Sequence, residues 1–124
     1  MKHTVALIGC GRISFKHIEA FAAMQDKLDL VAVCDPLLER AEEKKAEYGK
    51  SVPNASVKVF ADYKEMLSIC KPEVVTVATE SGKHKDVAVH CLRNGAHVIC
   101  EKPMALSTAD AQEMIDTAKQ YGKK

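Results

Sequence analysis

Short apolar runs rich in β-branched residues alternate along the chain with longer stretches whose apolar residues have helical spacing. The apolar runs predict five buried strands, at 5–8, 28–35, 57–60, 73–78 and 97–100. The other stretches predict helices at 12–25, 37–48, 63–70 and 83–94, and a last helix that starts at Ser107 or Thr108 and is closed by Gly122. This alternation is typical of an α/β fold with one parallel sheet, helices on both of its faces and right-handed crossovers.

Local signals mark the ends of several of these helices. Asp62 and Glu65 have the spacing of a capping box, which predicts a helix start directly after Asp62. Gly49 is interpreted as the C-terminal glycine of the charge-rich helix at 37–48, whose charged side chains form a solvated face. No internal repeat or low-complexity segment interrupts the alternation, so we expect one domain over residues 1–124.

The first predicted strand is followed by a turn with two glycines. Gly9 and Gly11 supply a tight turn and a backbone without side chains that a pyrophosphate can approach. A helix that starts near Arg12 directs its free N–H groups and the positive end of its dipole at such a phosphate. Gly9, Gly11, Arg12 and Ile13 are therefore candidate cofactor-binding residues. Ser14 stands where the dinucleotide fingerprint has a third glycine, and a small residue is tolerated there because that position governs close packing of helix on strand.

An acidic residue ends the second predicted strand. Asp35 lies at the distance from the glycine turn at which dinucleotide-binding folds carry an acid that binds the adenosine ribose hydroxyls. Its carboxylate would repel a 2'-phosphate and no arginine follows it immediately, which favours NAD over NADP; Arg40 is expected to lie too far away. Because Asp35 precedes Pro36, capping the following helix is an alternative role, and the two roles are compatible.

The loops that carry unusual residues all follow strands. In the dinucleotide-binding version of the fold, the strand order is 3-2-1-4-5 and the ligand binds at the carboxyl edge, where the order reverses between the first and fourth strands. The loops at 9–14, 79–82 and 101–103 and the residue Asp35 fall on that edge. The sequence therefore predicts a doubly wound Rossmann fold whose loops converge on one dinucleotide site.

Composition and charge narrow the range of partners. The 124 residues are 47% hydrophobic and 28% charged, as in soluble globular proteins. Lys and Arg number 18 against 17 acids, a formal net charge of +1, so there is no electrostatic case for binding nucleic acid or an anionic membrane. No apolar run approaches the length of a membrane span, and we expect the protein in the cytoplasm.

The cysteines and histidines give no sign of a disulfide framework or a metal site. Five cysteines, an odd number without a Cys-x-x-Cys pair, lie in or beside apolar segments and are interpreted as free thiols. Cys10 lies in the glycine turn near a helix N-terminus, where the pKa of a thiol can fall, so a reactive role is the alternative to a small core residue. His84, His90 and His97 lack the spacing of metal ligands, and we expect no metal.

Five motifs occur in order along the chain: Gly9-x-Gly11 with His17 downstream, Val31-Ala-Val-Cys-Asp35-Pro36, Phe60-Ala-Asp-Tyr-Lys-Glu-Met-Leu67, Ala78-Thr79 followed by His84, and Gly95-x-His97-Val-Ile-Cys-Glu101-Lys102-Pro103. Each is weak alone. Together and at this spacing they resemble the N-terminal domain of the oxidoreductase family named for glucose-fructose oxidoreductase, inositol dehydrogenase and the rhizopine protein MocA (Gfo/Idh/MocA).

The resemblance implies a domain that binds NAD or NADP and takes part in oxidising a secondary alcohol on a sugar, inositol or nucleotide-sugar. It implies that Lys102 is the catalytic lysine, also in contact with the cofactor, and that Thr79, His84 and Glu101 contact the cofactor or shape its pocket. A cation near the reacting oxygen stabilises developing alkoxide, and a desolvated lysine beside the positive nicotinamide ring can have a pKa suited to proton transfer. Without the resemblance, Lys102 would be interpreted as an exposed loop lysine before a proline.

The chain also departs from the family pattern. Glu80 stands where the family often has proline. Family members continue into a sixth strand and a second domain that holds the sugar, supplies the usual acid-base histidine and forms the oligomer contacts; we expect this chain to lack that domain. The chain alone is therefore expected to bind cofactor but scarcely to turn over. A full-length form is expected to be a homo-oligomer, and the exposed edge of the fifth strand is a candidate for dimer formation by this chain.

Three functions compete on this evidence. The first hypothesis is the cofactor-binding half of an NAD-dependent sugar-type dehydrogenase. The alternative is a non-catalytic nucleotide-binding or sensing module on the same fold, although the retained Glu101-Lys102-Pro103 argues against it. A methyltransferase is disfavoured because those enzymes commonly carry an acid just before the first glycine, where this chain has Leu7-Ile8. The sequence does not identify the substrate, because the resemblance places specificity mainly in the second domain.

Overall fold

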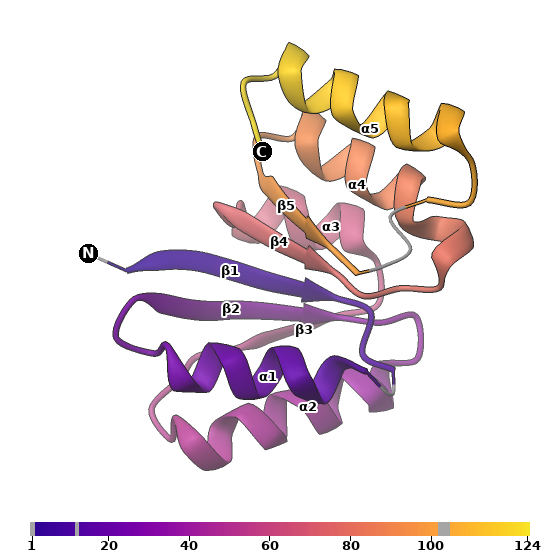
Figure 1. Ribbon diagram of the computed structural model, residues 1–124. Coiled ribbons are helices and arrows are strands. Elements are labelled where there is room, and N and C mark those ends of the chain that lie inside the picture. The colour runs from indigo at the N-terminus through magenta and orange to yellow at the C-terminus, as the bar shows by residue number, and fades with distance from the viewer. Residues whose placement is uncertain (1, 12, 102–104) are drawn as a thin grey trace.

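Five parallel strands form a single sheet in the predicted order β3-β2-β1-β4-β5 (Figure 1). The computed structural model describes residues 2–11, 13–101 and 105–124. The strands are β1 (His3–Ile8), β2 (Leu28–Cys34), β3 (Lys58–Phe60), β4 (Val74–Val77) and β5 (His97–Cys100). The helices are α1 (Ser14–Ala23), α2 (Leu38–Ser51), α3 (Tyr63–Cys70), α4 (His84–Arg93) and α5 (Thr108–Gln120), and a short 3-10 helix, η1 (Ser81–Lys83), precedes α4.

The central strand β1 pairs in parallel with β2 on one side and with β4 on the other. Val5, for example, lies opposite Leu30 of β2 and Val74 of β4. From β1 the chain passes through β2 to β3 at one edge of the sheet, then crosses back and adds β4 and β5 on the other side. The direction of winding therefore reverses between β1 and β4, which is where doubly wound folds bind their ligands.

Helices cover both faces of this sheet (Figure 1). α1 and α2 lie against one face, where Phe21 and Tyr48 pack with Val5 and Leu7 of β1. α3 and α4 lie against the other face, where Met66 packs with the opposite side chains of β1, β2 and β4. Strands enclosed in this way need apolar side chains on both faces, which explains the uninterrupted apolar runs in the sequence.

The last helix lies outside these layers. α5 runs along α4, and Met114 is buried with Ala88 and Val89 of α4, beside Val98 of the edge strand β5. On the opposite side of β5, Ile99 is 55% exposed. Ile99 lies on the face of the sheet that α1 and α2 cover farther along. Within the described residues, this face is exposed to solvent at β5.

The predicted helix signals hold at one helix and fail at another. Asp62 caps α3 as predicted, because its carboxylate accepts a hydrogen bond from the backbone N–H of Lys64 (2.9 Å). The prediction that α2 ends at Gly49 is wrong. Gly49 does not adopt the left-handed conformation of a C-terminal glycine, and the next turn continues until the N–H of Val52 donates to the carbonyl of Tyr48.

Candidate cofactor site

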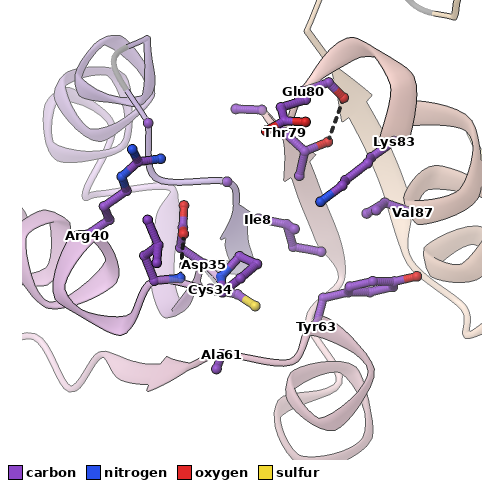
Figure 2. A pocket seen from close by; sticks show the side chains of 15 residues that line it. Ile8, Cys34, Asp35, Arg40, Ala61, Tyr63, Thr79, Glu80, Lys83 and Val87 are labelled. Carbon is purple, nitrogen blue, oxygen red and sulfur yellow. Dashed lines mark hydrogen bonds between the residues drawn. The ribbon is translucent and has the colours of Figure 1, made fainter.

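A cavity of about 460 Å³ opens at the carboxyl ends of β1, β2 and β4, where the strand order reverses (Figure 2). Its lining comes from the glycine turn, the ends of β2 and β4, the start of α2 and the segment that leads into α4. Of the candidate residues, the structure brings together Gly9, Gly11, Asp35 and Thr79 here. These loops, far apart in the sequence, therefore meet at one edge of the sheet as predicted.

The glycine turn lies tight against the end of β4. Gly9 has a φ of +97°, and a Cβ at this position would lie 2.5 Å from the carbonyl carbon of Ala78. Its N–H donates to the carbonyl of Cys34 (2.8 Å), which holds the turn against β2. A Cβ on Gly11, by contrast, would meet no atom within 4 Å among the described residues other than its chain neighbours. The fold itself requires the first glycine, whereas the second leaves open space beside the backbone.

The start of α1 completes the turn. Ser14, at the third fingerprint position, is fully buried, and its hydroxyl donates to the carbonyl of Gly11 (2.6 Å). Ile13 immediately precedes the helix, and no side chain caps the helix there. Arg12, the remaining candidate of this turn, lies outside the described residues. The backbone N–H groups of Ser14 and Lys16 donate to the carbonyls of Gly11 and Ile13, and within the described residues no such bond is recorded for the N–H of Phe15, which lies between them. An anion at this helix N-terminus is favoured by the helix dipole.

Asp35 holds the turn and the end of β2 together. Its side chain is only slightly accessible, at 6% exposure for the residue. One carboxylate oxygen accepts from the N–H of Cys10 (2.9 Å) and the other from the N–H of Leu37 (2.8 Å). The predicted alternative role as cap of the following helix is wrong, because α2 begins three residues after Asp35, at Leu38, and its N-terminal flanking residue is Leu37. The carboxylate instead fixes the position of the glycine turn relative to β2.

Two cations flank the cavity. Arg40 of α2 and Lys83 of η1 both line it, and Figure 2 shows them on opposite sides, the Lys83 amine extending toward the interior. Arg40, which was expected to lie too far from Asp35 to receive a 2'-phosphate, lies in the first turn of α2 and lines the same cavity as Asp35. Neither cation forms a salt bridge within the described part of the chain.

Thr79 and His84, which both follow β4, differ in their relation to the cavity. Thr79 lines the cavity directly. His84 does not; it is buried, at 1% exposure, and its Nε2 donates to the carbonyl of Thr79 (2.7 Å). His84 thus supports the backbone of the loop that borders the cavity, whereas the sequence resemblance implied a residue that contacts the cofactor or shapes its pocket.

The end of β5 carries a contact that the sequence reasoning missed. Glu101 continues the pairing of β5 with β4, since its N–H donates to the carbonyl of Val77 (2.9 Å). Its carboxylate accepts a hydrogen bond from Nε2 of His17 in α1 (2.9 Å). His17 entered the sequence analysis only as part of a motif, and a pair separated by 84 residues has no local signature. Lys102, the predicted catalytic lysine, lies outside the described residues.

The thiol of Cys10 is not activated. Burial and, to a smaller extent, the negative charge of Asp35 raise the pKa of Cys10 to about 12. The suggestion that the pKa falls at this helix N-terminus is therefore wrong, because the side chain points into the core. Cys10 is a small buried residue, and all five cysteines are free.

Within residues 2–11, 13–101 and 105–124, no group of three or more His, Cys, Asp or Glu side chains is arranged to hold a metal ion. None of the helices in these ranges combines the length and apolar character that crossing a bilayer requires.

The residues around the cavity fit a dinucleotide. The open space beside Gly11 admits a pyrophosphate at the start of α1. Asp35 offers carboxylate oxygens at the end of β2, and each retains acceptor capacity for a ribose hydroxyl after binding one backbone N–H. The order of groups along the cavity, phosphate site and then ribose site, matches the adenosine half of NAD.

Comparison with known proteins agrees with this assignment. A model of the Gfo/Idh/MocA group, described as an oxidoreductase family with an NAD-binding Rossmann fold, matches residues 3–124. D-glucoside 3-dehydrogenase of Escherichia coli is 40% identical over 119 residues, which cover 96% of this chain and 32% of that protein. Inositol 2-dehydrogenase of Salmonella typhimurium is 31% identical over 118 residues, covering 95% of this chain and 34% of that protein.

A similar solved structure is that of the WlbA dehydrogenase from Bordetella pertussis in complex with NADH and UDP-GlcNAcA. It superimposes with a TM-score of 0.89 at 32% identity, and the match covers 99% of this chain and 35% of that one. The chain thus spans about a third of the length of the relatives that it matches.

Proposed function

Because the chain belongs to the Gfo/Idh/MocA oxidoreductase family and is its NAD-binding Rossmann domain, we propose that it serves an enzyme that oxidises a secondary alcohol of a sugar, inositol or nucleotide-sugar. The substrate class is supported by the relatives, which include a D-glucoside dehydrogenase, an inositol dehydrogenase and a dehydrogenase bound to a nucleotide-sugar. The proposal concerns the activity of the whole enzyme, of which these residues form the cofactor-binding part.

The observation that carries the proposal is the double hydrogen bond of Asp35. A carboxylate that holds the N–H of Cys10 and the N–H of Leu37 is fixed before any ligand arrives, at the end of β2 and beside the glycine turn. Binding therefore needs no rearrangement of this group, and the cost of ordering it is already met by the fold. We assign Asp35 to the adenosine ribose and the turn formed by Gly9, Gly11, Arg12 and Ile13 to the pyrophosphate.

The same geometry explains a preference for NAD. A 2'-phosphate would lie near the carboxylate of Asp35, which is nearly buried and cannot turn away without losing two hydrogen bonds. Arg40, which lines the same cavity, offsets part of this repulsion. We therefore expect NADPH to bind more weakly than NADH but not to be excluded.

In this proposal NAD, when bound, supplies the acceptor for a hydride from the alcohol carbon. The chain's own residues orient the reaction. Thr79 and Glu101 lie at the ends of β4 and β5, on the side of the switch point opposite Asp35, and border the nicotinamide half. Lys102, assigned from the sequence resemblance, stabilises the negative charge that develops on the substrate oxygen and takes part in moving its proton.

The first test is a calorimetric titration of the chain with NADH and then with NADPH under identical conditions. We expect saturable binding of both, with NADH the tighter ligand, because Asp35 disfavours the 2'-phosphate. Gly11→Ala is the matched variant, since its Cβ meets no atom of the non-neighbouring residues that the structure describes and occupies the space offered to the pyrophosphate. Absence of binding to the unaltered chain, or equal binding to the Gly11→Ala variant, would contradict the proposed site.

A further inference from the structure

The hydrogen bond between His17 and Glu101 joins two parts of the fold that meet at the carboxyl edge of the sheet. His17 lies near the start of α1, Glu101 directly follows β5, and Nε2 of the first lies 2.9 Å from Oε1 of the second. The side chains are 18% and 27% exposed, so water competes only in part for this bond. The pair does not line the 460 Å³ cavity.

The place of the pair along the site follows from the strand order. Asp35 at the end of β2 marks the adenosine side of the switch point between β1 and β4. A dinucleotide that crosses this point extends over the ends of β4 and β5 on the other side. Glu101 is the residue at the end of β5, so the pair lies beside the nicotinamide half. This step rests on the proposed function.

Glu101 is held at both of its ends. The backbone N–H donates to Val77 of β4, and the carboxylate is fixed by His17 of α1. A carboxylate fixed in this way can accept hydrogen bonds from a ribose hydroxyl or a carboxamide N–H without first losing side-chain freedom. We propose that His17 is a positioning residue that orients Glu101 toward the nicotinamide half of the bound cofactor.

A purely structural role makes a different prediction. A bond that only braced α1 against the end of β5 would stabilise the fold and would influence every ligand of the site alike. A positioning role acts on one half of the cofactor. ADP-ribose contains the adenosine and both phosphates but lacks the nicotinamide, so comparing it with NADH separates the two possibilities.

The experiment measures the affinities of the 124-residue chain for NADH and ADP-ribose by calorimetry, together with the fluorescence of the reduced nicotinamide in the NADH complex. The variants are His17→Ala, which removes the donor, and His17→Gln, which retains a side-chain N–H that can reach a nearby carboxylate. His3→Ala is the matched control. His3 forms a 2.9 Å bond to Glu73, also between a histidine and a glutamate, at the opposite edge of the sheet.

We expect His17→Ala to weaken NADH binding by about tenfold and to change ADP-ribose binding less than about twofold. The nicotinamide fluorescence should move toward that of free NADH. His17→Gln should recover most of the affinity, and His3→Ala should change neither ligand.

The inference is overturned if His17→Ala weakens both ligands equally or leaves NADH unaffected, or if the unaltered chain binds NADH no more tightly than ADP-ribose. If the unaltered chain binds neither NADH nor ADP-ribose, that result contradicts the proposed function and therefore also this inference. If His17→Ala does not fold, His17→Phe, which keeps a ring but removes the donor, gives the same comparison. A selective loss of NADH affinity supports the inference, and an equal loss refutes it.

Discussion

Replacing Gly9 with alanine tests whether the glycine turn is required by the protein or by its ligand. The new Cβ would lie 2.5 Å from the carbonyl carbon of Ala78 and 2.7 Å from the backbone nitrogen of Thr79. Both atoms belong to the backbone at the end of β4, so no flexible side chain can move aside. The φ of +97° adds strain for any residue with a Cβ.

The expected change in the free energy of unfolding is the sum of these two effects, the backbone strain and the steric clash. A non-glycine residue in this region of φ costs about 1–2 kcal/mol, and forcing an extra carbon into a packed position costs about 1–3 kcal/mol. Together, Gly9→Ala should lower the free energy of unfolding by about 2–5 kcal/mol. That is a large part of the roughly 5–15 kcal/mol that stabilises an ordinary domain.

Urea denaturation followed by circular dichroism measures this change, and Gly11→Ala is the control. Within the described part of the chain, the Cβ of the control meets no atom beyond its chain neighbours, so the free energy of unfolding of this variant should change by less than about 0.5–1 kcal/mol. The same variant should bind NADH more weakly, because its methyl group occupies the space beside the turn. The reasoning is refuted if the two variants are equally stable, or if Gly9→Ala loses NADH affinity while its stability is unchanged.

Four further substitutions test individual groups. Asp35→Ala should weaken NADH binding by about tenfold and narrow the preference for NADH over NADPH. If the titration shows unchanged selectivity, Asp35 only binds the backbone N–H groups of Cys10 and Leu37 and does not select the cofactor. Arg40→Ala should weaken NADPH more than NADH by about threefold, whereas Arg93→Ala, remote from the cavity, should change neither ligand in the same assay. Burial raises the pKa of Cys91 to about 12 from an ordinary value of 9.0, so the unfolded chain ionises first as pH rises. The free energy of unfolding should therefore fall between these values by about 1.4 kcal/mol per pH unit for this thiol, and urea denaturation of Cys91→Ala should show a slope smaller by about that amount. The test of Lys102 uses a chimera that carries residues 1–124 in place of the matching part of D-glucoside 3-dehydrogenase. In this chimera, Lys102→Ala should slow hydride transfer by about a hundredfold and leave NADH affinity nearly unchanged. A loss of NADH affinity with unchanged hydride transfer would contradict the catalytic role.

The strand order and the position of the site could be predicted because each depends on a strong local pattern. Apolar runs long enough for strands alternate with helical stretches, and the only common arrangement of such units places every strand's carboxyl end at one edge. The positions of Gly9 and Asp35 at this edge could be predicted because a glycine turn next to a buried strand and an acid at a strand end are visible in the sequence. Capping by Asp62 is visible for the same reason.

Errors arose where tertiary contacts override a local signal. Gly49 has the right neighbours for a helix end, but the helix continues for another turn along the sheet. Arg40 was judged by its distance along the chain from Asp35, whereas the fold brings both residues to the lining of one cavity. For Cys10, the interpretation as a small core residue is confirmed, and only the alternative of a reactive thiol fails, because the side chain turns into the core.

The pairing of His17 with Glu101 could not be predicted at all. Each residue belongs to a motif, but nothing in either segment indicates that the two side chains meet across the fold. Only the relative placement of α1 and β5 brings them together. Contacts of this kind depend on the packing of whole elements, which single-sequence patterns do not encode.

The pairing of β1 with β4 also bears on how the chain acquires its structure. The chain segment between β1 and β2 is short, so their pairing closes a short loop. The pairing of Val5 in β1 with Val74 in β4 closes a much longer loop, which also contains β2, α2, β3 and α3. Closing so long a segment costs more chain entropy, so we expect β4 and β5 to dock late on an earlier β1–β3 unit. In the proposed cofactor site, the dinucleotide crosses the seam between these two assemblies. A molecule bound across the seam, from the glycine turn to Thr79, would slow their separation and so lengthen the lifetime of the folded chain.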